Sequence, residues 1–116
     1  MIPQPTSTKV GKHYSWGDGC DGWHLVHAAG LSVIEERMPP GTCEQRHWHA
    51  RSLQVFYVLA GTLTLEVEGA RHDLGPRSAL ELPQGMAHQA FNETEADVWF
   101  LVISMPPAQA DRHPTE

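Results

Sequence analysis

Apolar and polar residues alternate with a period of two along most of the chain. The clearest case is 62–68, where leucine and valine alternate with threonine and glutamate, which predicts a strand with one buried face. Residues 31–36 and 80–82 show the same alternation. Residues 98–103 are continuously apolar and rich in β-branched and aromatic types, which favours a strand packed on both faces over a short helix.

Glycine and proline mark turns between these segments. Residues 38–41 and 83–85 predict turns, and the dipeptides at 60–61 and 68–69 predict hairpin turns on either side of the strand 62–68. No segment of ten or more residues combines a helical period with start and stop signals. Many short strands separated by turns predict an all-β sandwich or barrel, and a closed or double-sheet arrangement leaves few exposed sheet edges.

The chain of 116 residues has room for one domain. Its apolar fraction of 41% is sufficient to build a core. Residues 1–12 are expected to form a flexible N-terminal segment and residues 106–116 a flexible C-terminal tail, because both are rich in proline and polar residues. This leaves residues 13–105 as the folded domain.

Charge and hydropathy exclude several classes of partner. The net charge is −6 and the basic residues are scattered, so no basic stripe is available to bind a nucleic acid. The apolar runs are shorter than the roughly 20 residues that span a membrane. No secretion signal opens the sequence, and Cys20 and Cys43 form no paired motif, so we expect a cytoplasmic protein with two free thiols.

The chain contains eight histidines, and three of them suggest a metal site. His47 and His49 are two residues apart, so on a strand both imidazoles lie on the same face, as a divalent metal requires. Gln54 begins the next strand, and His88 follows the turn at 83–85, which an antiparallel barrel can bring beside the pair. The alternatives are polar residues on a solvent face, a hydrogen-bonded core cluster, and, for Gln54, a water-bonded residue at the barrel mouth.

Two stretches of the sequence resemble the two motifs of the cupin family. They read Gly41-x5-His47-x-His49-x4-Gln54-x6-Gly61 and Pro83-x-Gly85-x2-His88-x3-Asn92. The resemblance implies the cupin double-stranded β-helix, a jelly-roll barrel, with one divalent first-row transition metal ion held by His47, His49, Gln54 and His88. Imidazole and oxygen ligands suit Ni, Zn, Fe, Co, Cu or Mn, so the identity of the metal stays open. The resemblance also implies a homodimer.

The chain departs from the cupin pattern at two positions. Most cupins carry glutamate in place of Gln54, and glycine in place of Arg77. Three neutral imidazoles and one amide leave the charge of a divalent ion uncompensated, so the site is expected to attract an anionic ligand and to favour Lewis-acid over redox chemistry. Arg77 is expected to affect the geometry of its turn.

Several other side chains are candidates for roles around the site. The expected substrate pocket consists of Phe56, Val58, Met86, Phe91 and Trp99, with plain core packing as the alternative for each. A substrate carboxylate could be bound by Arg37, Arg46, Arg51 or Arg77, with solvated surface arginine as the alternative. Cys43 is a candidate additional ligand. The sequence identifies no catalytic base.

The ligand set is similar to that of the small cupins that convert unsaturated uronates to open-chain keto sugars. Those enzymes use acidic and basic residues near the last strand, whereas residues 98–103 are apolar here. We therefore predict a metal-dependent cupin that acts on a small anionic or oxygen-rich metabolite, such as a sugar acid or keto acid, by isomerisation, enolisation or elimination. The alternatives are an Fe- or Ni-dependent dioxygenase and a metabolite-binding cupin without turnover.

Overall fold

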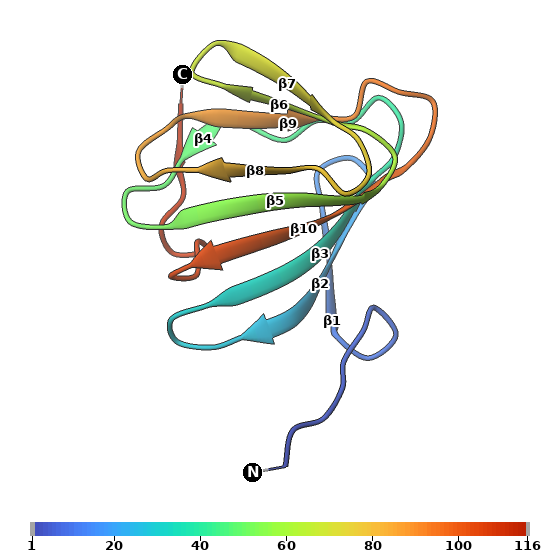
Figure 1. Ribbon diagram of the computed structural model, residues 1–116, viewed down its shortest axis with the longest axis vertical. Helices are drawn as coiled ribbons and strands as arrows, with labels where there is room; N and C mark the ends of the chain where they lie inside the picture. Colours follow the sequence, from blue (N-terminus) through green and yellow to red (C-terminus); the bar gives the residue numbers. More distant parts are fainter. Residues whose placement is uncertain (1, 116) are drawn as a thin grey trace.

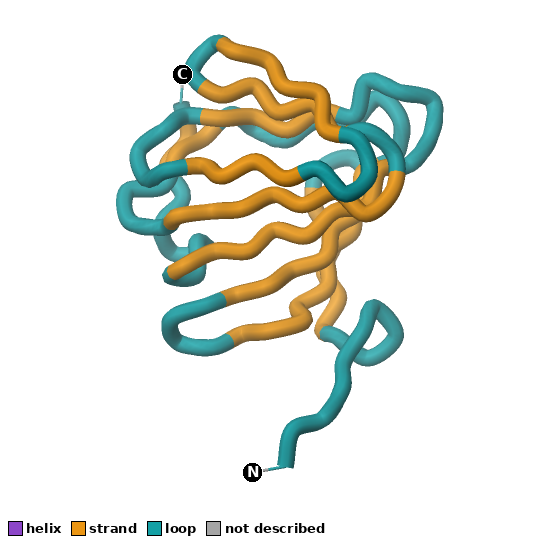
Figure 2. The backbone as a smooth tube through the Cα atoms, viewed as in Figure 1, coloured by secondary structure: helices purple, strands orange, loops and turns teal. Residues whose placement is uncertain are grey.

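The alternating segments of the sequence form the strands of the structure. The computed structural model describes residues 2–115, which contain strands and loops but no helix (Figure 2). No helix that could cross a membrane therefore occurs among these residues. The strands are β1 (Lys12–Trp16), β2 (Cys20–His27), β3 (Ser32–Met38), β4 (His47–Trp48), β5 (Leu53–Ala60), β6 (Leu63–Val67), β7 (Ala70–Leu74), β8 (Ala79–Leu82), β9 (His88–Phe91), β10 (Val98–Met105) and β11 (His113–Pro114).

The strands form two antiparallel sheets (Figure 1). One sheet has the order β1-β2-β3-β10-β5-β8 and the other the order β11-β4-β9-β6-β7. From β4 to β10 the chain passes repeatedly from one sheet to the other, so strands distant in sequence become neighbours. This confirms the all-β jelly-roll architecture that the motif resemblance implies.

Only one of the two expected hairpin turns joins paired strands. Glu68 and Gly69 both have positive φ and join β6 to β7 in one sheet. The turn at Ala60 and Gly61 instead connects β5 to β6, which lie in different sheets, so the hairpin predicted there is wrong. A Cβ on Gly61 would lie 2.4 Å from the backbone oxygen of Asp97, so this close approach requires glycine.

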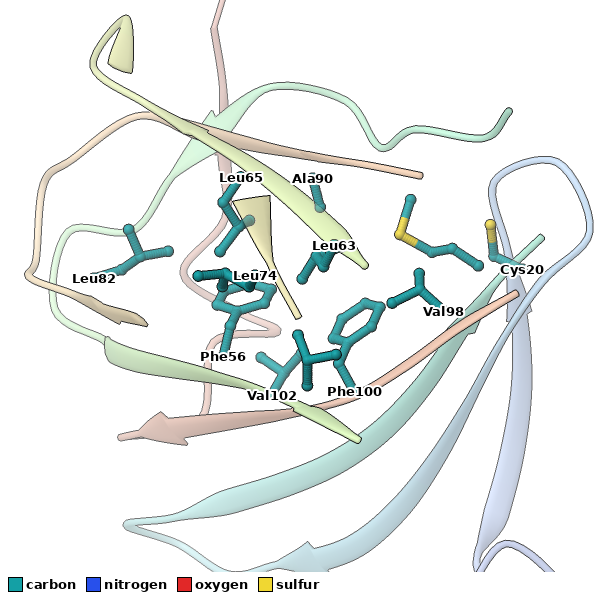
Figure 3. Close-up of a cluster of buried hydrophobic side chains, with 12 residues drawn as sticks. Cys20, Phe56, Leu63, Leu65, Leu74, Leu82, Ala90, Val98, Phe100 and Val102 are labelled. Carbon is teal, nitrogen blue, oxygen red and sulfur yellow. The ribbon is translucent and has the colours of Figure 1, made fainter. Parts of the chain in front are cut away.

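The inward faces of the two sheets form an apolar core (Figure 3). In Figure 3, Phe56 of β5 and Phe100 of β10 point into the same interior as Leu63 and Leu65 of β6. Along β10, buried residues alternate with half-buried ones. This strand is therefore fully buried on one face rather than on both, which corrects the expectation drawn from its apolar run.

The residues after β10 pack against the barrel instead of forming a free tail. Strand β11 pairs with β4, and the side chain of Asp111 is buried. Its carboxylate accepts hydrogen bonds from the backbone N–H groups of residues 50–52, at 2.9, 2.7 and 3.0 Å. The expected flexible tail at 106–116 is thus replaced, over its described part, by a segment anchored through one carboxylate. Residues 2–11 form no strand.

Candidate functional site

Three buried histidines converge between the sheets. His47 of β4 and His88 of β9 are direct partners in the antiparallel ladder, and His49 follows β4. Each imidazole places a ring nitrogen within 4.8 Å of the others. The pairing of β4 with β9 therefore brings the two motifs together. Cys43 is exposed and lies outside this cluster.

Main-chain carbonyl groups hold the second nitrogen of each imidazole. Nδ1 of His47 lies 2.7 Å from the carbonyl oxygen two residues earlier in the chain, and Nδ1 of His88 lies 3.0 Å from the corresponding carbonyl oxygen. Nδ1 of His49 lies 2.6 Å from the carbonyl oxygen of Asp111. Since a carbonyl can only accept, each Nδ1 carries the proton and each Nε2 keeps its lone pair. The Nε2 atoms of His49 and His88 are buried and have no hydrogen-bond partner.

Gln54 adds an unpaired oxygen to the site. This residue lies on β5 opposite Ser104 of β10, and its amide nitrogen donates to the Ser104 hydroxyl at 3.0 Å. Its Oε1 is buried and has no partner. Three nitrogen lone pairs and one amide oxygen without competing partners fit a divalent transition metal, which would satisfy the orphaned buried atoms.

Burial also sets the protonation state of the histidines. It lowers the pKa of His47 to about 3 and lowers the pKa values of His49 and His88 as well. All three imidazoles are therefore neutral at neutral pH. Metal binding requires this form, so no proton has to be displaced at neutral pH.

A cavity of about 320 Å³ adjoins the histidines, a size that suits a small molecule. Its apolar lining comes from Trp16, Ile34, Phe56, Phe100 and Val102. These residues lie on the inward face of the larger sheet and form an apolar wall of the cavity. Polar groups therefore act there at a lower effective dielectric than in bulk water.

Of the five expected pocket residues, Phe56 is the one that lines this cavity. Val58, two residues further along β5, is fully buried in the core beyond it. Met86 is 39% exposed and lies in the turn before β9. Neither residue lines the cavity. For Val58 the reason is that shared parity on a strand fixes the face but not the depth along the barrel, whereas Met86 lies in a turn, to which strand parity does not apply.

Phe91 and Trp99 lie outside the cavity for a different reason. Each has the opposite parity to a buried neighbour, Ala90 and Phe100 respectively. The ring of Phe91 lies 5.1 Å from the guanidinium carbon of Arg71, and Trp99 stacks on an outward-facing tryptophan of β2. Both aromatic residues therefore cover the outer surface of the barrel, which corrects the prediction.

Several polar residues that the sequence analysis did not identify line the cavity, among them Tyr14, Glu36, Glu44 and Arg112. The Tyr14 hydroxyl donates to Glu36 Oε2 at 2.6 Å, and the backbone N–H of Ala90 donates to Glu44 Oε2 at 2.9 Å. Burial raises the pKa of Glu36 to about 7 and that of Glu44 to about 8. One signal was available in the sequence, because Glu36 has the same parity as Ile34 in an otherwise apolar row.

The arginine in the cavity is also not one that we expected. Arg37 and Arg46 form ion pairs outside the cavity, and Arg51 and Arg77 are exposed. Arg112 lines the cavity instead, from the segment that was expected to be a flexible tail. The buried carboxylate of the preceding residue anchors this segment, and this one anchor accounts both for the order of the segment and for the position of Arg112.

Comparison with known families decides the identity of the fold. A family model described as a cupin domain matches residues 34–104. The chain belongs to the cupin family. The match covers both motifs and the strands between them, which confirms the family resemblance seen in the sequence.

Solved structures show how widely this cupin fold is shared. KdgF from Halomonas sp. is 21% identical with a TM-score of 0.84, over 94% of this chain and 98% of that chain. The polyketide cyclase RemF from Streptomyces resistomycificus is 19% identical with a TM-score of 0.83, over 99% and 87% of the two chains. A sugar phosphate isomerase from Silicibacter pomeroyi is 22% identical with a TM-score of 0.79, over 90% and 76%. At these identities the comparison shows the fold alone. A search of curated proteins found no match to this chain.

Proposed function

We propose that this cupin is a metal-dependent enzyme that acts on a small anionic or oxygen-rich metabolite, such as a sugar acid or keto acid. The observation that carries the proposal is the convergence of three neutral imidazoles and one amide oxygen beside a cavity of small-molecule size, with buried and unpartnered lone pairs on His49, Gln54 and His88. A divalent first-row ion bound by His47, His49, Gln54 and His88 would act as a Lewis acid, supporting isomerisation, enolisation or elimination.

The charge of the cavity supports an anionic substrate. The four candidate ligands are neutral, so they leave the charge of a divalent ion uncompensated in a low-dielectric site. Arg112 adds a second positive charge. It forms a long ion pair with Glu44, whose Oε1 lies 3.8 Å from the guanidinium nitrogen, beyond hydrogen-bonding distance. The guanidinium can therefore bind a substrate carboxylate in bidentate geometry.

The walls of the cavity support the same proposal. Phe56, Phe100 and Val102 limit the access of water to the reacting carbon atoms. The hydrogen-bonding groups lie on other parts of the lining, so a bound molecule is oriented by its anionic group and by the oxygen atoms near the histidines. A keto acid combines both features in a molecule small enough for the cavity.

The test uses the metal-loaded protein and a panel of small 2-keto acids in D₂O. We expect exchange of the protons next to the carbonyl, followed by NMR, to require Ni²⁺, Zn²⁺, Co²⁺, Mn²⁺ or Fe²⁺ and to stop when a chelator is added. Metal-dependent consumption of oxygen without proton exchange would favour the dioxygenase alternative and contradict the proposal.

A charge-changing variant tests the binding part of the proposal. Gln54→Glu places a carboxylate among the ligands and compensates part of the metal charge, so tartrate should bind the metal-loaded variant more weakly in calorimetry. Gln84→Glu introduces the same charge at an exposed position and should leave tartrate binding unchanged. Equal or tighter binding of tartrate by Gln54→Glu would contradict the charge argument.

A further inference from the structure

Glu36 is an acidic residue that the metal site itself does not require. It lies on the inward face of β3 and lines the cavity. Its side chain is half-buried, and its accessible atoms face the cavity. Its one hydrogen bond comes from Tyr14, and among residues 2–115 it forms no ion pair. A carboxyl group removed from bulk water without a cationic partner is unfavourable for folding, and such groups are typical of functional sites.

A row of three strands positions this carboxyl group. Tyr14 of β1 is the ladder partner of Gly22 of β2, which in turn is the partner of Glu36 of β3. A Cβ on Gly22 would lie 2.2 Å from Cζ of the Tyr14 ring. The absence of a side chain on β2 therefore allows the tyrosine to lie over the strand between them and to donate to the glutamate.

We propose that Glu36 is a catalytic residue that transfers a proton to and from the substrate, and that Tyr14 is the residue that positions it; this inference rests on the proposed function. The Glu36 carboxylate would accept a proton from a carbon next to the substrate carbonyl. The electron pair of the broken C–H bond becomes the second bond of an enolate, and the carbonyl oxygen takes the negative charge. Return of the proton from Glu36 to the same carbon restores the substrate, which gives exchange in D₂O. Where that carbon carries a hydroxyl group, the hydroxyl proton moves to the enolate oxygen, and delivery of the proton from Glu36 to the former carbonyl carbon forms the new carbonyl and completes an isomerisation.

The groups that face Glu36 favour this role. Tyr14, His24, Glu44 and Arg112 line the cavity with it, from β1, β2, the segment before β4 and the segment before β11. Burial raises the pKa of Glu36 to about 7, whereas the hydrogen bond from Tyr14 and the charge of Arg112 act in the opposite direction. Both the charged and the neutral form are therefore available at neutral pH, as a general acid–base requires.

The first test compares Glu36→Gln with Glu35→Gln, since the neighbouring glutamate lies on the other face of β3 and does not line the cavity. We expect Glu36→Gln to reduce the metal-dependent exchange of substrate protons by at least ~100-fold, with unchanged metal content and with a tartrate affinity no weaker than that of the wild type. Glu35→Gln should exchange at the wild-type rate. Undiminished exchange in Glu36→Gln would overturn the inference.

A second readout does not depend on turnover. Binding of an anion beside a carboxylate favours its protonation, so tartrate binding near pH 7 should take up a fraction of a proton, measured by calorimetry in buffers of different ionisation enthalpy. This uptake should fall in Glu36→Gln to the share that Glu44 contributes, and it should persist in full in Glu35→Gln. Equal uptake in all three proteins would overturn the inference. If the wild type shows no exchange with any keto acid, the proposed function fails, and the proton uptake alone decides whether Glu36 changes its protonation state when an anion binds.

The role of Tyr14 has its own signature. Removal of its hydrogen bond raises the pKa of Glu36, because that bond stabilises the carboxylate. Tyr14→Phe should therefore shift the pH profile of exchange to higher pH without abolishing exchange. An unchanged profile would show that Tyr14 has only a structural role and would overturn this part of the inference.

Discussion

Two groups of side chains lie in or beside the cavity, and they are built in different ways. The histidine group consists of His47, His49, Gln54 and His88, and the acidic group consists of Tyr14, Glu36, Glu44 and Arg112. The histidine group is neutral, and main-chain carbonyls or a serine hydroxyl fix the atoms that do not face the site. The acidic group carries the charges, and its members come from four separate segments of the chain.

This difference separates two tasks within one cavity. The histidine group has the fixed geometry and the lone pairs that a metal requires, and burial keeps its imidazoles unprotonated. The acidic group contains carboxyl groups that titrate near neutral pH, together with a cation that an anion can approach. A change in one group should therefore alter metal binding, and a change in the other should alter the binding and the protonation of a substrate.

The largest expected effect concerns the anchor shared by the two groups. Asp111 supplies the carbonyl that holds His49, and its side chain fixes the segment that carries Arg112. Asp111→Ala should weaken metal binding by ~10–100-fold in competition with a chelator, because the orientation of an imidazole ligand is lost. Asp18→Asn, at an exposed position, is the control and should bind like the wild type. Wild-type affinity in Asp111→Ala would show that this anchor does not orient the ligand.

The Asp111 anchor also has a pH dependence of known sign. Backbone N–H groups hold the pKa of the Asp111 carboxyl well below its usual range. Its contribution to stability is therefore present above the ordinary aspartate pKa of ~3.9 and is lost as the pH falls below it. Thermal melts of the wild type and the alanine variant should converge in acid.

The next effect distinguishes the groups through stability. The pKa of Glu36 is higher in the folded than in the unfolded protein, so the folded state binds more protons and is destabilised as the pH rises from about 4.5 to about 7. Glu36→Gln removes this penalty. Urea titrations give the free energy of unfolding of both proteins at each pH. The difference, variant minus wild type, should be ~2 kcal/mol larger at pH ~8 than at pH ~4.5. A difference that is independent of pH would contradict the shifted pKa.

A smaller effect is expected for anion recognition. Arg112→Gln should weaken tartrate binding to the metal-loaded protein by ~10-fold, a moderate loss because the guanidinium is partly exposed to solvent. Metal content should not change. Arg71→Gln removes an exposed guanidinium outside the cavity and serves as the matched control in the same calorimetric titration. An equal loss in both variants would indicate a general electrostatic effect rather than a contact.

The smallest effect tests the turn where the sequence departs from the cupin pattern. Arg77 has a φ of 67°, so the turn keeps the conformation that favours glycine although arginine occupies it. Arg77→Gly should raise the free energy of unfolding by ~0.5–1 kcal/mol, because relief of strain is partly offset by the greater freedom of glycine in the unfolded chain. Urea denaturation measures this difference, and a destabilised variant would show that the arginine side chain contributes more than its backbone costs.

The same comparison explains what the sequence could and could not predict. His47, His49 and His88 were identified because strand parity and two short motifs are local features, and two of these imidazoles are held by carbonyls two residues away. The family and the jelly-roll fold followed from the same features. The homodimer and the cytoplasmic location stay predictions.

The acidic group was missed because nothing local defines it. Glu36 and Tyr14 meet only through the register of three strands, and Arg112 reaches the cavity only because a buried carboxylate anchors the C-terminal segment. Parity likewise could not say how deep along the barrel Val58 lies. Depth and register depend on the assembled sheets, which no short motif encodes.

The most direct test of the account is the metal content of the protein, because every proposed role depends on the histidine group. Protein loaded with Ni²⁺, Co²⁺ or Zn²⁺ and then dialysed should retain about one ion per chain by elemental analysis, and His88→Ala should retain almost none while still melting cooperatively. His72→Ala, which removes an exposed histidine from β7, should retain the wild-type amount. Full metal occupancy in His88→Ala, or none in the wild type, would contradict the central claim that these buried lone pairs form a metal site.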